Sequence, residues 1–161
     1  MNKNNEILTL EKDIVTPSTM VLAPYHHEWY QATIIDRYAG EIYSEETTSK
    51  IIESSCLHWS SAPEGIRRAM RFQLGFHKKS PLAIQPELDL FGFPTISPEQ
   101  FGCYWIFPRH VWKKGGDKNR SYIIFRNQVR MEFPISYYVL NKQYQRTCEI
   151  YFKYKMAIAE Q

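Results

Sequence analysis

The stretch S-Y-I-I-F-R-N-Q-V-R-M-E-F-P-I-S-Y-Y-V-L, residues 121–140, places two strands directly before a helix. Tyr122–Phe125 and Val129–Phe133 are rich in β-branched and aromatic residues and flank a short turn, which predicts a β-hairpin. A helix of about 20 residues is expected from near Ser136 to the end of the chain, because apolar side chains recur there at the helical period. Its apolar face consists of Val139, Leu140, Thr147, Ile150, Tyr151, Tyr154 and Ile158. A hairpin followed by a helix indicates the α+β class.

Upstream of this stretch, short runs of β-forming residues alternate with Pro, Gly and polar turns, as in an antiparallel sheet. The expected strands are Met20–Pro24, Ala32–Asp36, Glu41–Ser44, Cys56–Trp59, Pro81–Ile84, Leu88–Phe91, Cys103–Phe107 and Val111–Trp112. Residues 50–59 give mixed signals, because their spacing also permits the start of a short helix. Residues 1–18 are expected to be loosely held, residues 92–100 to form a loop and residues 113–120 to form a turn. The sequence therefore predicts one α+β domain over residues 1–161, mainly an antiparallel sheet with one short basic helix and a long C-terminal helix.

The short basic helix is predicted within S-S-A-P-E-G-I-R-R-A-M-R-F-Q-L-G-F-H-K-K-S, residues 60–80. Ser61 and Glu64 form a capping-box pattern, and Gly75 is suited to end the helix. One helical stripe is apolar and consists of Ile66, Ala69, Met70 and Leu74. Another flank is cationic and consists of Arg67, Arg68 and Arg71, and the positive charge continues beyond the helix with Lys78 and Lys79.

Charge is distributed unevenly along the chain. Residues 1–60 hold four Lys/Arg and nine Asp/Glu, whereas residues 61–161 hold sixteen Lys/Arg and eight Asp/Glu. A basic portion of this kind suggests a polyanionic partner, although the same asymmetry is also expected if the two portions pack on each other. Besides the cations at residues 67–79, one more basic cluster stands out, and it consists of Lys113, Lys114, Lys118 and Arg120.

No pattern of residues points to catalysis, to a metal or to a cofactor. Cys56 and His58, with Cys103 and His110, are the best zinc candidates, but the chain has no C-x-x-C or H-x-x-x-H spacing. No cysteine carries a local nucleophile signature, and Gly-Gly at residues 115–116 lacks the spacing of a phosphate loop. We therefore expect no enzyme activity, no cofactor and no metal.

The chain is expected to be a cytoplasmic protein. No segment approaches the length of a membrane span, and the N-terminal residues lack the apolar run of a signal peptide. The three cysteines are far apart and odd in number, which fits a reducing compartment better than a disulfide framework.

Two classes of function remain. Arg enters a narrow minor groove at a lower desolvation cost than Lys, and a Lys-rich turn is suited to holding phosphates. No helix-turn-helix pattern is visible, so DNA binding by phosphate and groove-shape readout is favoured over base reading in the major groove. A protein-interaction module is the alternative, because an aromatic content of 15% also suits interfaces. The last helix carries tyrosines that we interpret as core, with a dimer interface as the alternative: Tyr137, Tyr138, Tyr144 and Tyr151.

Several blocks carry a resemblance to a known family. They are SKIIESSCLHWSS (Ser49–Ser61), HKKSPLAI (His77–Ile84), FGFPTISP (Phe91–Pro98), GCYWI (Gly102–Ile106), MEFPISY (Met131–Tyr137) and YQRT (Tyr144–Thr147). In this order the blocks resemble ComK, the competence transcription factor family of low-GC Gram-positive bacteria, over roughly residues 47–150. MEFPISY is the most specific of them.

The resemblance implies a DNA-binding activator of competence (DNA-uptake) genes that binds A/T-rich promoter boxes through the minor groove as a homo-oligomer. Gly65-Ile66-Arg67-Arg68 lies in the neighbourhood of the family's basic motif, although the resemblance assigns base contacts to no residue. Longer members carry a C-terminal tail that a proteolytic adaptor recognises. Because this sequence stops at Gln161, the resemblance leaves open whether such an adaptor is a partner of this chain. The candidate DNA contacts are Arg67, Arg68, Arg71, Lys78, Lys79, Lys113, Lys114, Lys118 and Arg120.

Overall fold

A computed structural model describes residues 13–60 and 79–160 of the chain. The strands are β1 (Thr19–Pro24), β2 (Ala32–Asp36), β3 (Gly40–Ser44), β4 (Leu82–Gln85), β5 (Leu90–Pro94), β6 (Trp105–Ile106), β7 (Val111–Gly116), β8 (Ser121–Phe125) and β9 (Arg130–Phe133). The helices are α2 (Thr48–Trp59), α4 (Tyr137–Ala159) and the short 3-10 helices η1 (Pro86–Leu88) and η2 (Pro108–His110). The basic helix predicted between Ser61 and Gly75 lies outside the described residues.

The strands form two antiparallel sheets. Strands β1–β6 make a six-stranded sheet in the order β3-β2-β1-β6-β5-β4, and the three-stranded sheet has the order β7-β8-β9. The chain leaves the larger sheet at one edge, β3, and re-enters it at the opposite edge, β4. The predicted α+β class, with mainly antiparallel strands and a long C-terminal helix, is confirmed.

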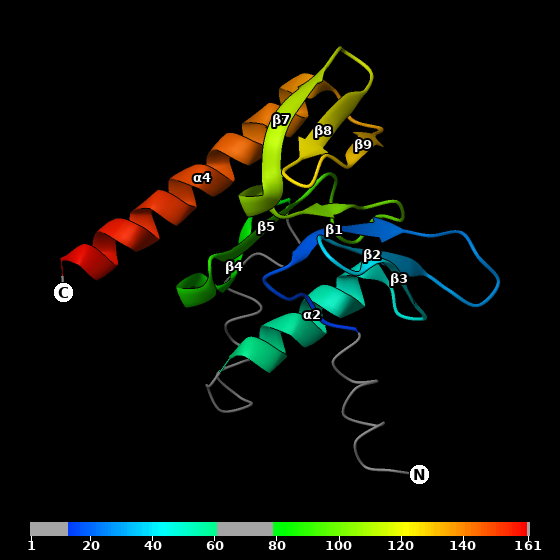
Figure 1. The fold of residues 1–161 in the computed structure, drawn as a ribbon, viewed down its shortest axis with the longest axis horizontal. Coiled ribbons are helices and arrows are strands. Elements are labelled where there is room, and N and C mark those ends of the chain that lie inside the picture. Colours follow the sequence, from blue (N-terminus) through cyan, green and yellow to red (C-terminus); the bar gives the residue numbers. More distant parts are fainter. Residues whose placement is uncertain (1–12, 61–78, 161) are drawn as a thin grey trace, which may run out of the picture.

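Both faces of the six-stranded sheet are buried except at its edge strand β3, which makes the sheet the middle layer of the molecule. Neighbouring residues of a strand point to opposite faces. Leu22 and Trp105 belong to the core on the α2 side, whereas Val21 and Ile106 belong to the core shared with the three-stranded sheet and α4. Helix α2 therefore covers one face, and the three-stranded sheet and α4 cover the other (Figure 1).

Residues 48–59 form one helix, α2, so the strand predicted at Cys56–Trp59 is wrong. The Thr47 side chain accepts a hydrogen bond from the Lys50 N–H at 3.2 Å and caps the first turn. Buried Ile51, Ile52 and Ser55 follow the helical period, and packing of that face on the sheet outweighs the β preference of the local sequence.

Strand β5 continues through Gly92-Phe93-Pro94, where a loop was predicted. The phenyl ring of Phe107 covers Gly92 so closely that a Cβ atom there would lie 2.8 Å from the ring carbon Cε1. Pro94 is tolerated because it is the last residue of the strand. Gly92 is therefore explained by close packing against Phe107, and Pro94 by its position at the end of the strand.

Residues 13–18 are firmly packed, in contrast to the loose N-terminal segment predicted for residues 1–18; residues 1–12 lie outside the described part. Val15 is fully buried, its N–H donates to Ser55 Oγ at 2.8 Å, and its carbonyl accepts from Trp59 Nε1 at 2.8 Å. The segment is thus tied to α2 through both the N–H and the carbonyl of Val15.

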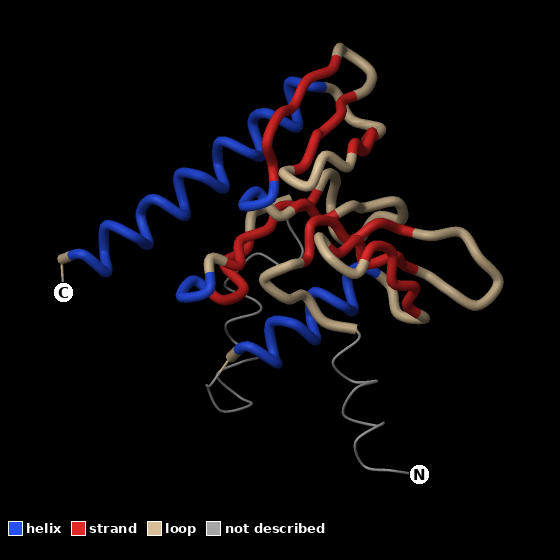
Figure 2. The backbone as a smooth tube through the Cα atoms, viewed as in Figure 1, coloured by secondary structure: helices blue, strands red, loops and turns tan. Residues whose placement is uncertain are grey.

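Helix α4 buries side chains in its first half and keeps only edge contacts with the body beyond it. Ser136 caps it by accepting the Val139 N–H at 3.2 Å, and Leu140, Gln143 and Thr147 are buried. The end of the helix extends away from both sheets (Figure 2), and the predicted face member Ile158 is exposed there. Tyr154 is 40% exposed, although its ring centroid lies 5.7 Å from that of Phe91 in β5. None of the helices in residues 13–60 and 79–160 combines the length and apolarity needed to cross a membrane.

Candidate nucleic-acid interface

The β7–β8 hairpin carries the basic cluster that was predicted as a turn. Strand β7 runs to Gly116, so Lys113 and Lys114 lie on a strand and point to opposite faces of the sheet. Lys113 Nζ lies 4.2 Å from the ring centroid of Trp112, which is 54% exposed. The predicted cluster is therefore divided, with Lys113 on the outer face and Lys114 on the face that meets α4.

The tip of this hairpin is a tight turn organised by Asp117. The carboxylate Oδ1 of Asp117 accepts the backbone N–H groups of Asn119 at 2.8 Å and Arg120 at 3.0 Å, which lowers the pKa of Asp117 below its usual value. Gly116 has φ +145°, a conformation that other residues rarely adopt. The turn holds Lys118 and Arg120 exposed at the projecting end of the molecule (Figure 1).

The outer face of the three-stranded sheet adds a cation that the sequence analysis did not select. Arg120 lies 3.3 Å and Arg130 lies 3.6 Å from the carboxylate of Glu132, and Arg130 also stacks on Tyr122 with its Cζ 4.5 Å from the ring centroid. One glutamate is thus shared by two arginines, and the three exposed side chains contribute a net positive charge.

On the opposite face of the hairpin, Lys114 meets helix α4. Its Nζ lies 4.3 Å from the ring centroid of Tyr144. Tyr144 also lines a cavity of about 270 Å³ to which Arg109 and Arg126 contribute. Arg126 Nε donates to the Arg109 carbonyl at 3.2 Å, so backbone contacts hold the two arginines side by side.

Lys79 lies against the same helix rather than in an open loop. The Lys79 carbonyl accepts Gln143 Nε2 at 3.2 Å and Arg146 Nη1 at 3.3 Å. Burial lowers the pKa of Lys79 below its usual value, and the positive charge of Arg146 lowers it further. Lys79 and Arg146 thus form one cationic pair.

Two basic surfaces follow from these contacts. The hairpin surface consists of Lys113, Lys118, Arg120 and Arg130. What we call the α4 surface consists of two groups on opposite flanks of that helix: Arg109, Lys114 and Arg126 lie beside Tyr144, and Lys79 and Arg146 lie beside Gln143. Arg67, Arg68, Arg71 and Lys78 lie outside the described residues.

The two surfaces contain arginines that isolated sequence positions did not reveal: Arg109, Arg126, Arg130 and Arg146. Arg109, Arg126 and Arg130 lie in separate elements or turns, whereas Arg146 shares α4 with other lysines. Strand pairing brings Arg130 beside Arg120, and the docking of α4 brings Arg146 beside Lys79. The rings that Lys114 and Arg130 contact lie on other elements, so sequence spacing gives no signal for these two contacts.

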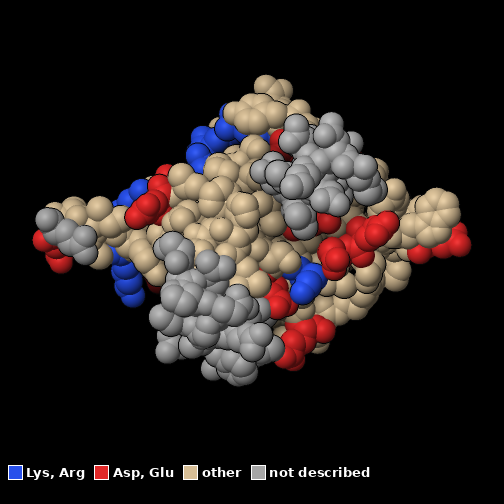
Figure 3. Space-filling model, turned by 90° about the horizontal axis from the view of Figure 1, so that it is seen from below, with Lys and Arg blue, Asp and Glu red and all other residues tan. Residues whose placement is uncertain are grey.

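Charge is also segregated at the scale of the molecule. On the face drawn in Figure 3, Asp and Glu lie mainly toward the end that carries β1–β3, and Lys and Arg lie mainly toward α4. A polyanion is therefore expected to approach the molecule from the side of α4 and the hairpin.

Comparisons of the sequence with known proteins identify the family. A sequence model of the family described as ComK protein matches residues 10–159. The chain belongs to the ComK family. It is 31% identical over 108 residues to the competence transcription factor of Bacillus subtilis (strain 168), an alignment that covers 66% of this chain and 56% of that protein. The chain thus spans about half the length of its curated relative, and no solved structure matches it.

The zinc candidates of this ComK-family chain are not gathered into one site. Within residues 13–60 and 79–160, no group of three or more His, Cys, Asp or Glu side chains is placed to hold a metal ion. Cys103 is buried, its thiol donates to the Ile96 carbonyl at 3.4 Å, and burial raises the pKa of the thiol to about 11. Cys103 therefore acts as a small core residue.

Proposed function

We propose that this ComK-family chain is a DNA-binding transcription activator of competence genes that acts in the bacterial cytoplasm on A/T-rich promoter boxes. Family membership and the relative named as a competence transcription factor support a role in transcription. The observation that carries DNA binding is the projecting β7–β8 hairpin, with Lys113, Lys118 and Arg120 exposed on it.

The proposed mode of binding places the hairpin tip at the minor groove. That groove is about 6 Å wide and narrows in A-tracts, where the negative potential attracts inserted Arg and Lys side chains. The Asp117 turn is internally hydrogen-bonded, so Lys118 and Arg120 are presented on a fixed backbone. The α4 surface then supplies further phosphate contacts through Arg126 and Arg146.

Fluorescence anisotropy with a labelled A/T-rich duplex, a G/C-rich duplex and a salt titration tests this proposal. The double variant Lys118→Ala/Arg120→Ala is expected to weaken A/T binding about tenfold or more. It is also expected to reduce the salt slope by roughly one for each phosphate that the variant no longer neutralises. The control Lys50→Ala/Lys153→Ala removes the same charge from exposed positions outside the hairpin and is expected to bind almost as wild type.

A folded wild-type chain that binds neither duplex would reject the proposal. It would favour the alternative class, a regulatory module that contacts another protein. Equal losses in the hairpin variant and in the control would show that binding follows net charge alone, and would remove the hairpin from the proposed interface.

The homo-oligomer remains part of the proposal. The outer half of α4 exposes Phe152 at 64%, Met156 at 48% and Ile158 at 51%, and the first two lie one helical turn apart. A second copy packing on Phe152 and Met156 would bury both side chains.

A further inference from the structure

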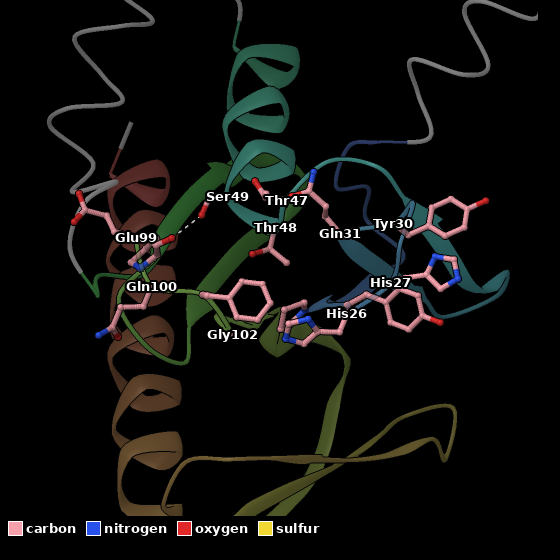
Figure 4. Close-up of a pocket in the computed structure, with 14 residues that line it drawn as sticks. His26, His27, Tyr30, Gln31, Thr47, Thr48, Ser49, Glu99, Gln100 and Gly102 are labelled. Carbon is pink, nitrogen blue, oxygen red and sulfur yellow. Dashed lines mark hydrogen bonds between the residues drawn. The ribbon is translucent and has the colours of Figure 1, made fainter.

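A second cavity lies away from both basic surfaces, beside the loop that joins β1 to β2. It has a volume of about 650 Å³. The loop residues 24–31, the first residues of α2 and the segment 98–102 form its walls (Figure 4). We call it the β1–β2 cavity, and nothing in the proposed DNA contacts uses it.

Hydrogen bonds fix the walls of this cavity. Thr48 Oγ1 donates to the Cys103 carbonyl at 3.2 Å, and Ser49 Oγ donates to the Pro98 carbonyl at 2.6 Å, which ties segment 98–103 to the start of α2. Gln31 Nε2 donates to the carbonyl of residue 45 at 2.7 Å. The cavity is therefore formed before any ligand enters, which lowers the entropy cost of binding.

Aromatic rings dominate two sides of the cavity. The ring centroids of His26 and Phe101 are 4.6 Å apart, and the ring centroid of His27 lies 5.5 Å from that of Tyr25 and 5.3 Å from that of Tyr30. Phe101 is 70% exposed, although it belongs to a well-formed wall. Ring faces attract cations, and a large exposed ring beside a cavity is a typical anchor for a bound peptide.

The charge around the cavity has one prevailing sign. Among the described residues, none that lines the cavity is Lys or Arg. Glu99 is the one Asp or Glu among the described residues that line the cavity, and Glu28, Glu45 and Glu46 adjoin the lining segments in the sequence, as does the single lysine Lys50. A cationic ligand is therefore complementary to the rim, whereas DNA is repelled.

The geometry points to a docking site for a peptide segment of another protein that presents a Lys or Arg side chain next to an apolar one. The cation lies against the faces of Tyr25 and Tyr30, and the apolar side chain packs on Phe101. DNA and such a partner would then occupy opposite ends of the same molecule.

Panning a phage library of random peptides on the immobilised full chain identifies the ligand chemistry, and a synthetic copy of a recovered peptide is titrated by calorimetry. Recovered peptides are expected to be enriched in Lys or Arg beside apolar residues. Phe101→Ser is expected to weaken the synthetic peptide about tenfold or more, and Glu45→Gln/Glu46→Gln several-fold. Tyr38→Ser removes an equally exposed ring outside the cavity and is expected to have no effect.

Circular dichroism and thermal melting check that the variants fold. No enrichment, enrichment of acidic peptides, or a peptide that binds Phe101→Ser as well as wild type would overturn the proposal. Self-association that Phe101→Ser abolishes in sedimentation would make a second copy the occupant and also overturn it. A/T-duplex affinity is expected to be unchanged by Phe101→Ser, and a matching loss would assign the cavity to DNA instead.

Discussion

His110 is buried, with 3% of its surface exposed, where the three-stranded sheet adjoins the N-terminal segment. Its Nε2 lies 2.8 Å from the Pro17 carbonyl, so Nε2 is the protonated nitrogen in the neutral ring. Nδ1 is buried without a hydrogen-bond partner among the described residues. Burial lowers the pKa of His110, and Arg109 and Arg37 lower it further against the opposite effects of Pro17 and Asp36.

This depressed pKa predicts acid-sensitive stability. Below the ordinary His pKa of about 6.5, His110 binds a proton in the unfolded chain but stays neutral in the folded chain. The free energy of unfolding therefore falls as pH decreases. The loss is at most about 1.4 kcal/mol per pH unit for one group. Between about pH 7.5 and 5.5, urea unfolding is expected to show a smaller decrease in the free energy of unfolding for His110→Gln than for wild type. An identical pH dependence of that free energy in the two proteins would contradict the lowered pKa of His110.

Cys103 predicts selective thiol chemistry. A thiol whose pKa is about 11 and whose surface is 1% exposed holds almost no accessible thiolate at pH 8. In the variant Cys56→Ser/Cys148→Ser, iodoacetamide is expected to leave Cys103 unmodified in the native protein and to modify it in urea. Mass spectrometry gives the readout, and rapid native labelling would show that the core opens around Cys103.

At the scale of the element, β5 is a strand because of the residue that covers it. A Cβ at Gly92 would meet the Phe107 ring, and Phe107 is itself 1% exposed and cannot move aside. Local sequence suggests a break here, since Gly and Pro interrupt strands on average. Packing of Gly92 against the Phe107 ring outweighs this local preference for a break.

Gly92→Ala is therefore expected to destabilise the fold by about 1–3 kcal/mol through overpacking. In a Phe107→Leu background, where the ring is gone, the same substitution is expected to cost less, and a double-mutant cycle in urea measures the difference. Additive effects of the two substitutions would mean that Gly92 is required for another reason.

At the scale of the whole molecule, α4 links the two basic surfaces to an exposed apolar end. Tyr138 is 71% exposed and Tyr151 is 38% exposed, so the core assigned to the tyrosines of this helix is wrong for Tyr138 and incomplete for Tyr151. Tyr151 packs edge-on against Phe91 at 5.3 Å, and Lys155 Nζ lies 2.7 Å from Asp89. These contacts hold one side of the helix and leave Phe152 and Met156 outward.

If a second copy covers that outward side, Phe152→Ser/Met156→Ser is expected to shift the chain toward monomer in sedimentation equilibrium while leaving the melting temperature nearly unchanged. Tyr138→Ser, an exposed ring at the other end of the same helix, is the control. Wild-type chain that stays monomeric at every concentration, or a variant that associates as wild type does, would contradict the proposed interface.

The sequence alone determined the α+β class, most of the strands, the hairpin and the long last helix, because alternation, turn residues and the 3.6-residue period are local properties. It also determined family membership through ordered blocks. Only the tertiary structure decided that residues 48–59 are one helix, that Lys113 and Lys114 face apart, and which arginines meet at α4. These outcomes depend on contacts between elements distant in the chain, and local propensities of about 1 kcal/mol or less per residue are outweighed by burial.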